Sequence, residues 1–253
     1  MNPFNLDGKR VVVTGASSGI GRQCAVACAA MGASVALLGR DRERLGRTLG
    51  AMDAAGGHHL FTADLTDEAA VVALARALGE ECGRVHGLVH CAGISATLPL
   101  RSTTRARIET LFQTNVSSAL YLTREIVRPG RFAAEGGSVI FLSSVMGSRG
   151  EMGKTLYSMT KGALLAGARS LACELAPRRI RVNTVSPGAV ITPINEALPH
   201  IADPEKRRRL EERHPLGLGT PADVAHACVY LLSDAARWVT GADLVVDGGY
   251  SAR

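Results

Sequence analysis

The stretch that most constrains the fold is a glycine-rich turn near the start of the chain. Three valines, residues 11–13, lead directly into Thr14-Gly15-Ala16-Ser17-Ser18-Gly19-Ile20-Gly21, and a helical pattern follows. Glycines here allow a tight turn, close approach of the backbone to a ligand, and close packing of helix on strand. The amino end of the helix adds free N–H groups and a positive dipole. The stretch predicts a diphosphate site; a turn that holds no ligand is the alternative.

A dinucleotide is the first ligand to propose, because its diphosphate suits a strand–turn–helix context. We expect contacts from Gly15, Ser17, Ser18, Gly19, Ile20 and Gly21. The next predicted strand ends at Gly39-Arg40, where the ribose beside the adenine would lie. Gly39 leaves room for a 2′-phosphate and the Arg40 guanidinium can bind one, so we expect NADP(H) to be preferred over NAD(H). A solvated Arg40, or a role shared with Arg42 and Arg44, is the alternative.

Asp64 closes the third predicted strand and is expected to bind the adenine amino group. An alternative is that Asp64 or Thr66 caps the helix that follows, since both residue types favour the N-cap.

Short aliphatic runs alternate with longer amphipathic segments along the chain. The runs cover residues 10–14, 34–38, 59–61, 85–90, 138–142, 181–185 and 244–246. They are rich in valine and do not alternate with polar residues, which predicts strands buried on both faces of a parallel sheet. Helical patterns cover residues 19–31, 41–54, 67–82, 104–130 with a possible break, 155–176 and 221–233. The pattern predicts an α/β fold, a Rossmann-type doubly wound parallel seven-stranded sheet with helices on both faces.

The length of 253 residues suits a single domain, residues 1–253, because no linker or low-complexity stretch divides the chain. Residues 193–219 interrupt the alternation with four prolines and a charged helical stretch. An insertion of this kind on an open sheet usually covers the ligand crevice, so we expect a substrate-capping lid there.

Composition argues against several classes of protein. The net charge is +6, but basic residues are scattered, aromatics make up only 4%, and no nucleic-acid-binding motif occurs. No apolar run approaches the roughly 20 residues that cross a bilayer, and no leader sequence is evident, so a cytoplasmic protein without membrane attachment is expected. The six cysteines form no paired motif, which favours buried thiols in a reducing compartment and gives no support to a metal site.

The stretch Tyr157-Ser158-Met159-Thr160-Lys161 places a lysine one helical turn after a tyrosine, which alone is a weak signal. Its surroundings resemble the short-chain dehydrogenase/reductase family over nearly the whole chain. The resemblance rests on residues 14–21, Asp64, Cys91-Ala92-Gly93, Asn115, Ser144, Tyr157 with Lys161, Pro187-Gly188 with Thr192, and Asp247-Gly248-Gly249. All occur in the family's order and spacing, which indicates that Tyr157 and Lys161 are a catalytic pair.

The resemblance implies hydride transfer between a nicotinamide and a carbonyl or secondary alcohol. Tyr157 would exchange a proton with the substrate oxygen, and the Lys161 ammonium would lower the tyrosine pKa and hold the nicotinamide ribose. Ser144 would bond the substrate oxygen, with Ser143 as second choice, and Asn115 would kink its helix and hold a water of the proton relay. The other implied cofactor contacts are Leu65, Ala92, Gly93, Pro187, Gly188 and Thr192.

The chain departs from the family where His90 and Cys91 precede Ala92-Gly93, since asparagines often stand there. We expect a satisfied interior histidine and a small buried thiol, with the cofactor still accommodated.

The resemblance is greatest to 3-oxoacyl-carrier-protein reductases and their paralogues, so a 3-oxoacyl thioester is one expected substrate. The basic run Lys206–Arg209 would then receive an acyl-carrier protein or coenzyme A, or else form a solvated helix face. Family members commonly form homotetramers through the helices at 104–130 and 155–176. A catalytically idle NADP(H)-binding sensor or regulatory subunit is the alternative function, but such a protein would normally have lost the serine, tyrosine or lysine.

Overall fold

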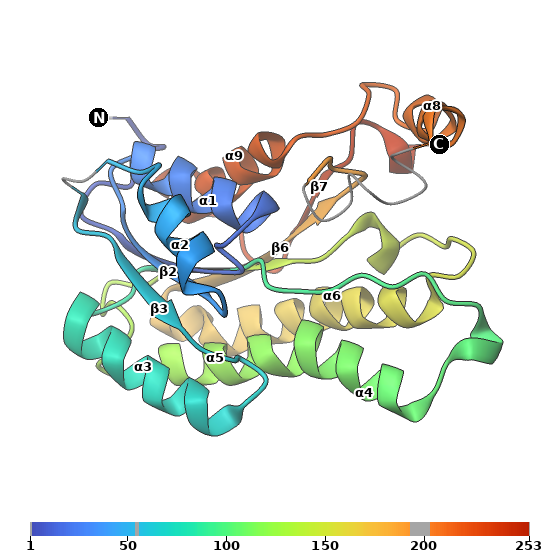
Figure 1. The fold of residues 1–253 in the computed structure, drawn as a ribbon. Helices are drawn as coiled ribbons and strands as arrows, with labels where there is room; N and C mark the ends of the chain where they lie inside the picture. The colour runs from blue at the N-terminus through green and yellow to red at the C-terminus, as the bar shows by residue number, and fades with distance from the viewer. Residues whose placement is uncertain (1, 54–55, 193–202, 253) are drawn as a thin grey trace.

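A parallel sheet lies at the centre of the molecule (Figure 1). The computed structural model describes residues 2–53, 56–192 and 203–252. The strands of the described chain are β1 (Arg10–Thr14), β2 (Ser34–Gly39), β3 (His59–Thr62), β4 (Gly87–His90), β5 (Gly137–Leu142), β6 (Ile180–Pro187) and β7 (Asp243–Val246). Within that part they form one seven-stranded sheet in the order β3-β2-β1-β4-β5-β6-β7, with parallel pairings. The predicted doubly wound fold is confirmed, and its order reverses between β1 and β4, where such sheets bind ligands.

Helices cover both faces of the sheet (Figure 1). One face carries α1 (Gly19–Ala30) and α9 (Pro221–Leu232), which pack on each other, and the other carries α3 (Glu68–Cys82), α5 (Ser118–Ile126) and α6 (Thr155–Leu175). The remaining α-helices described are α2 (Arg42–Leu49), α4 (Arg105–Phe112) and α8 (Pro204–Glu212). Helix α8 lies beside the carboxyl terminus of the chain, at one end of the molecule (Figure 1).

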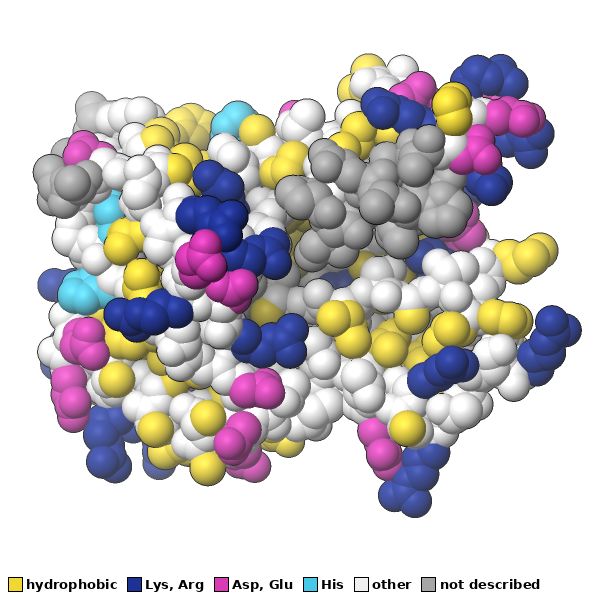
Figure 2. Space-filling view, viewed as in Figure 1, with side chains coloured by type: hydrophobic (Ala, Val, Ile, Leu, Met, Phe, Trp, Pro, Cys, Tyr) yellow, Lys and Arg dark blue, Asp and Glu magenta, His cyan; other side chains and the backbone are white. Residues whose placement is uncertain are grey.

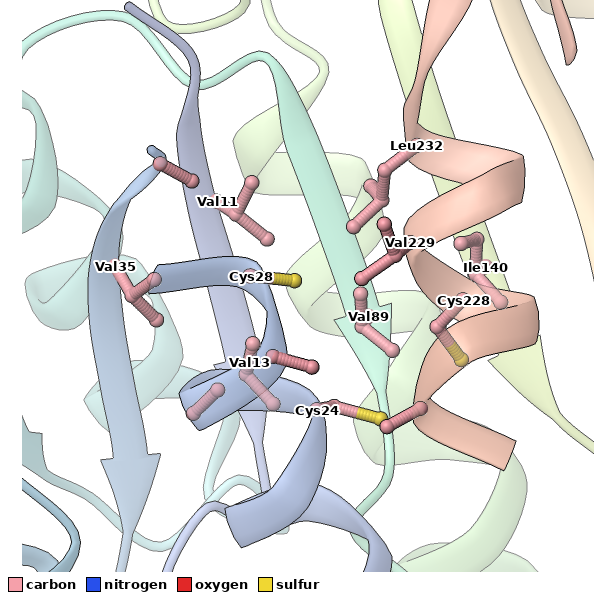
Figure 3. Packing of buried hydrophobic residues seen from close by; sticks show 14 of the residues in the cluster. Val11, Val13, Cys24, Cys28, Val35, Val89, Ile140, Cys228, Val229 and Leu232 are labelled. Atoms are coloured by element: carbon pink, nitrogen blue, oxygen red, sulfur yellow. The ribbon is translucent and has the colours of Figure 1, made fainter. Parts of the chain in front are cut away.

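Successive residues of β1 serve two different cores. Val11 and Val13 belong to the cluster under α1 and α9, whereas Val12 belongs to the cluster under α3, α5 and α6. Side chains alternate between the faces of a strand, and both faces are buried here, so the run shows no polar alternation. Figure 3 shows the first cluster, in which the thiols of Cys24 and Cys28 lie among aliphatic side chains.

The cysteines are only partly as expected. All six are free thiols, and Cys24, Cys28 and Cys228 are buried. Cys173, however, is exposed on α6, so the expectation of buried thiols is wrong at that position.

Several element boundaries differ from the sequence prediction. Strand β4 begins at Gly87, because Val85 forms only an isolated bridge with Phe132. Helix α2 ends at Leu49, with Gly50 as its C-cap, five residues before the predicted end. The expected break within 104–130 is present as a π-helical segment, Gln113–Ser117, between α4 and α5.

Candidate active site

The turns after β1 and β4 pack backbone against backbone. Gly15 has a positive φ of 65°, and a Cβ atom there would lie 2.9 Å from the nitrogen of Ala92. A Cβ at Gly21 would lie 2.3 Å from the oxygen of Gly15. The Thr14 hydroxyl accepts a hydrogen bond of 3.0 Å from the Ala92 nitrogen. No side chain fits at either glycine, as the close approaches expected of a dinucleotide-binding turn require.

The amino end of α1 has the properties that a diphosphate needs. Its N-cap, Ser18, is extended and makes no side-chain capping bond, and the first turn of the helix contains no acidic residue. Thr192 reaches this point from the chain after β6, because a Cβ at Gly19 would lie 3.4 Å from its side chain. The N–H groups of a helix amino end therefore border a space where an anion is favoured, and the residues present fit the diphosphate of a dinucleotide.

The end of β2 brings Arg40 close to Asp64. Arg40 is exposed and forms no ion pair within the described chain, and its positive charge helps to lower the pKa of Asp64. The larger cause of that lowered pKa is Thr66, whose backbone nitrogen and hydroxyl donate to the carboxylate at 2.9 and 2.7 Å. The N-cap of α3 is Asp67, so neither Asp64 nor Thr66 caps that helix. Leu65, beside them, packs against the core below α3.

Tyr157, Ser144 and Lys161 meet at the carboxyl edge of the sheet. Lys161 is buried on α6, and its Nζ lies 5.7 Å from the centre of the Tyr157 ring. A hydrogen bond with Ser144 acts on the Tyr157 hydroxyl. A Cβ at Gly93 would lie 3.6 Å from the Lys161 Nζ, so the β4 turn also borders the group. The structure thus brings together three residues that lie on two different elements.

The expected effect of Lys161 on Tyr157 is not what the structure shows. Burial raises the pKa of Tyr157, and the Ser144 hydrogen bond opposes that rise. The Lys161 ammonium donates to the Leu142 carbonyl at 2.7 Å and lies 5.7 Å from the centre of the Tyr157 ring. Burial also lowers the pKa of Lys161 to about 8. At neutral pH, therefore, Tyr157 holds its proton and is not a phenolate.

The two adjacent serines after β5 have different surroundings. The Ser143 hydroxyl donates to the Lys161 carbonyl at 2.9 Å and is committed to holding α6. The Ser144 hydroxyl accepts from the Met146 nitrogen at 3.2 Å, and its other side-chain interaction is with Tyr157. Ser144 is therefore the serine available to a substrate.

Asn115 lies in the π-helical segment, and its side chain is buried. Its Oδ1 accepts from the Ile94 nitrogen at 2.8 Å, and its Nδ2 donates to the Ile94 carbonyl and the Thr160 hydroxyl at 2.9 and 3.0 Å. The amide therefore fastens the β4 turn to α6. The expected irregularity of the helix is present, and π-helical segments of this kind often mark functional sites.

Lys154 was not singled out by the sequence analysis, although it lies at the site. It immediately precedes α6, and its Nζ lies 5.6 Å from the centre of the Tyr157 ring and 3.5 Å from the Ser95 hydroxyl. Only four lysines occur in the chain, and two of them lie over one tyrosine ring. The scarcity of lysine in the sequence was the signal that could have pointed to Lys154.

His214 is a second residue that the sequence analysis missed. It is buried, its Nε2 accepts from the Ala189 nitrogen at 3.1 Å, and its Nδ1 donates to the Leu210 carbonyl at 2.8 Å. These bonds require a neutral ring and join α8 to the turn after β6. The neighbouring Pro187-Gly188 pair ends that strand, and a Cβ at Gly188 would lie 2.9 Å from Asp247.

The two departures from the family pattern are structural residues. His90 is buried and stacks on Phe141, with 4.8 Å between the ring centres. Its Nε2 forms a hydrogen bond of 2.8 Å with the Thr123 hydroxyl. Burial lowers its pKa to about 3, so it stays neutral as expected. Cys91 is half-buried, so the expectation of a buried thiol is wrong there too, and its Sγ lies 3.9 Å from that of Cys24.

Only part of the expected lid lies within the described residues, since 193–202 are outside them. In α8, the basic run is neutralised by its own helix: Arg207 pairs with Glu211 at 2.9 Å and Arg208 with Glu212 at 2.6 Å. Arg209 pairs with Glu205, and Lys206 with Asp203 at 3.4 Å. On the face shown in Figure 2, Lys and Arg side chains are likewise interspersed with Asp and Glu. The pairing favours a solvated helix face.

The described residues contain neither a membrane-spanning helix nor a cluster of metal-binding side chains. No helix among them is both long and apolar enough to span a bilayer. No group of three or more His, Cys, Asp or Glu side chains among them is arranged to hold a metal ion.

Comparisons with known proteins agree with this arrangement. The family model described as enoyl-(acyl carrier protein) reductase matches residues 15–251. An L-rhamnose 1-dehydrogenase (NAD(P)(+)) of Azotobacter vinelandii is 39% identical over 247 residues, which cover 95% of this chain and 96% of that protein. A human 3-oxoacyl-[acyl-carrier-protein] reductase is 36% identical over 243 residues, with 95% and 97% covered. A candidate 2-deoxy-D-gluconate 3-dehydrogenase of Agrobacterium tumefaciens, solved with bound NADP, superposes with a TM-score of 0.88 at 31% identity over the whole of both chains.

Proposed function

Since the chain belongs to the short-chain dehydrogenase/reductase family, we propose that it is an NADP(H)-dependent oxidoreductase that interconverts a carbonyl compound and a secondary alcohol. The observation that carries the proposal is the convergence of Tyr157, Ser144 and Lys161 beside a turn suited to a diphosphate.

Each residue of the group has a role that its surroundings support. Bound NADPH would supply the hydride. The Ser144 hydroxyl binds the substrate oxygen, and Tyr157, kept protonated by burial, donates a proton to that oxygen as negative charge develops on it. Lys161 holds a positive charge behind the ring and replenishes the proton. Asn115 fixes the distance between the β4 turn and α6 and holds a water on the relay.

Preference for NADP(H) is supported by Arg40. Its guanidinium is exposed and free of ion pairs within the described chain, and Gly39 before it has no side chain to exclude a phosphate. We assign the diphosphate to the turn at residues 14–21 and Thr192, the adenine to Asp64 and Leu65, and the nicotinamide end to Ala92, Gly93, Pro187 and Gly188.

For the substrate, we favour a small hydroxylated or oxo compound over a carrier-linked 3-oxoacyl thioester. Two of the proteins compared above act on sugars or sugar acids by name, whereas one acts on an acyl-carrier protein. The basic run of α8 is already paired within its own helix, which removes the reason to expect a docked acidic carrier. The segment 193–219 is proposed to cover this substrate.

A homotetramer is also proposed. Apolar side chains are exposed on the helices expected to form its interfaces: Ile108 on α4, Leu120 on α5 and Met159 on α6. Ala166, also exposed on α6, would let a second helix approach closely. A sedimentation run that shows only a 26.5 kDa species would contradict this assembly. The cytoplasmic location stays a prediction.

The test is an absorbance assay of NADPH and NADH oxidation with oxo acids, ketosugars, 3-oxoacyl thioesters and simple diketones. Tyr157→Phe should abolish turnover while the affinity for NADPH is retained, and Tyr121→Phe, a tyrosine on α5, serves as the matched control. If wild-type protein binds NADPH tightly but turns over nothing in the panel, the idle sensor is favoured. Equal turnover by wild type and Tyr157→Phe would refute the assigned proton donor.

A further inference from the structure

Lys154 is a half-buried cation beside the proposed proton donor, and nothing in the proposed reaction yet uses it. We propose that Lys154 binds a carboxylate of the substrate, so that the protein acts on hydroxy acids and the corresponding oxo acids. This inference rests on the proposed function and specifies its substrate class.

The position of Lys154 fits a substrate-binding role. Its Nζ lies 5.6 Å from the centre of the Tyr157 ring, about as far as the Nζ of Lys161 at 5.7 Å. Lys161 donates to the Leu142 carbonyl and is buried, whereas Lys154 remains partly accessible. One ammonium therefore serves the protein interior, and the other remains partly accessible beside the tyrosine.

Lys154 lacks the acidic partner that a half-buried cation usually has. Within the described residues, no carboxylate oxygen lies within 4.0 Å of its Nζ, although Lys9 and Lys206 each have one, at 2.6 and 3.4 Å. Glu151 acts on Lys154 through its charge, but its carboxylate bonds Arg213 at 2.9 Å. Burial lowers the pKa of Lys154, which shows that the charged form is poorly solvated there. An anion bound beside it would offset this cost.

The surrounding donors suit a carboxylate of a small molecule. Lys154 makes one long contact, 3.5 Å to the Ser95 hydroxyl, so the ammonium retains protons to donate and the hydroxyl retains its own. Ser95 belongs to the turn after β4, which Asn115 fixes through Ile94. One ammonium and one hydroxyl match the two oxygens of a singly charged carboxylate. That carboxylate is bound only, and none of its bonds changes in the reaction.

Binding without turnover tests this assignment. We would measure by calorimetry the dissociation constants of 2-oxo, 3-oxo and sugar-derived oxo acids, each beside its uncharged amide, for protein saturated with oxidised NADP, with which an oxo compound cannot react. At least one acid should bind wild type about tenfold or more tightly than its amide. Lys154→Met should remove that preference by weakening the acid alone, and Lys154→Arg should retain part of it. The control is Lys9→Met, the same change of charge on a lysine that pairs with Asp234.

Three outcomes would overturn the inference. In the first, no acid in the panel binds wild type better than its amide. In the second, Lys154→Met binds the acid as tightly as wild type does, and in the third, Lys154→Met binds acid and amide more weakly by the same factor. The last would indicate a structural role only. Failure of the proposed function is distinguishable, because it would appear as acid-selective binding with no NADPH oxidation. Turnover without acid preference would refute the inference and leave the proposed function standing.

Discussion

The hydroxyl of Ser143 donates a hydrogen bond of 2.9 Å to the backbone carbonyl of Lys161. This bond joins the end of β5 to the middle of α6, 18 residues later in the chain. It sets the distance between the strand that ends beside Ser144 and the helix that carries Tyr157. Ser143 therefore fixes the position of Ser144 relative to Tyr157.

Replacing Ser143 and Ser144 one at a time should distinguish a residue needed for stability from one needed for catalysis. Ser144→Ala is expected to lower kcat about a hundredfold with little change in the free energy of unfolding, because the one backbone bond of the Ser144 hydroxyl, from the Met146 nitrogen, is long at 3.2 Å. Ser143→Ala removes a buried hydrogen bond between the end of β5 and α6 and should lower the free energy of unfolding by about 0.5–1.5 kcal/mol. Denaturant melts and NADPH oxidation rates would measure both. The reverse pattern would show that Ser143 is the catalytic serine.

Arg40 should control the choice between NADPH and NADH. Arg40→Ala removes a charge-assisted contact to the 2′-phosphate, so kcat/KM for NADPH should fall about tenfold to a hundredfold while that for NADH stays within about twofold. Arg42→Ala, two residues further along the chain at the start of α2, is the control. If Arg42→Ala produces the larger loss, the phosphate site lies at the start of α2 instead.

Lys161 should make stability depend on pH in a defined direction. Its pKa is lowered from 10.5 to about 8 by burial, so between these values the unfolded chain holds a proton that the folded chain has lost. Stability rises with pH wherever the unfolded state binds more protons, so this residue should increase the free energy of unfolding with pH across that window, by at most about 1.4 kcal/mol per pH unit. Urea melts of cofactor-free wild type and Lys161→Met would measure this. Parallel curves above pH 8 would contradict it.

Asn115→Asp should damage the site although the two side chains have nearly the same shape. An aspartate cannot donate to the Ile94 carbonyl or the Thr160 hydroxyl, so two bonds of 2.9 and 3.0 Å are lost. We expect the free energy of unfolding to fall by several kcal/mol and kcat to fall with it. Asn115→Gln retains the chemistry of the amide but not its length. An aspartate variant as stable and active as wild type would exclude the fastening role.

Local patterns predicted those features that depend on neighbouring residues. The bounds of β1 were predicted to the residue, because an aliphatic run buried on both faces is visible in the sequence itself. The sequence could not show which of Ser143 and Ser144 bonds the α6 backbone, since that difference depends on how α6 packs against β5. Lys154 was missed for a similar reason: its neighbour Ser95 lies 59 residues away, and only the fold brings the β4 turn to α6.

The close contact between the turns after β1 and β4 bears on how the molecule melts. The Thr14 hydroxyl holds the Ala92 nitrogen, and the space beyond Gly15 is filled by the same backbone. The turn after β1, proposed to bind the nucleotide, therefore cannot open without disturbing the turn after β4, which borders the proposed reacting group. A nucleotide bound at the first turn is therefore expected to stabilise the second turn as well, because it would bind the folded state alone.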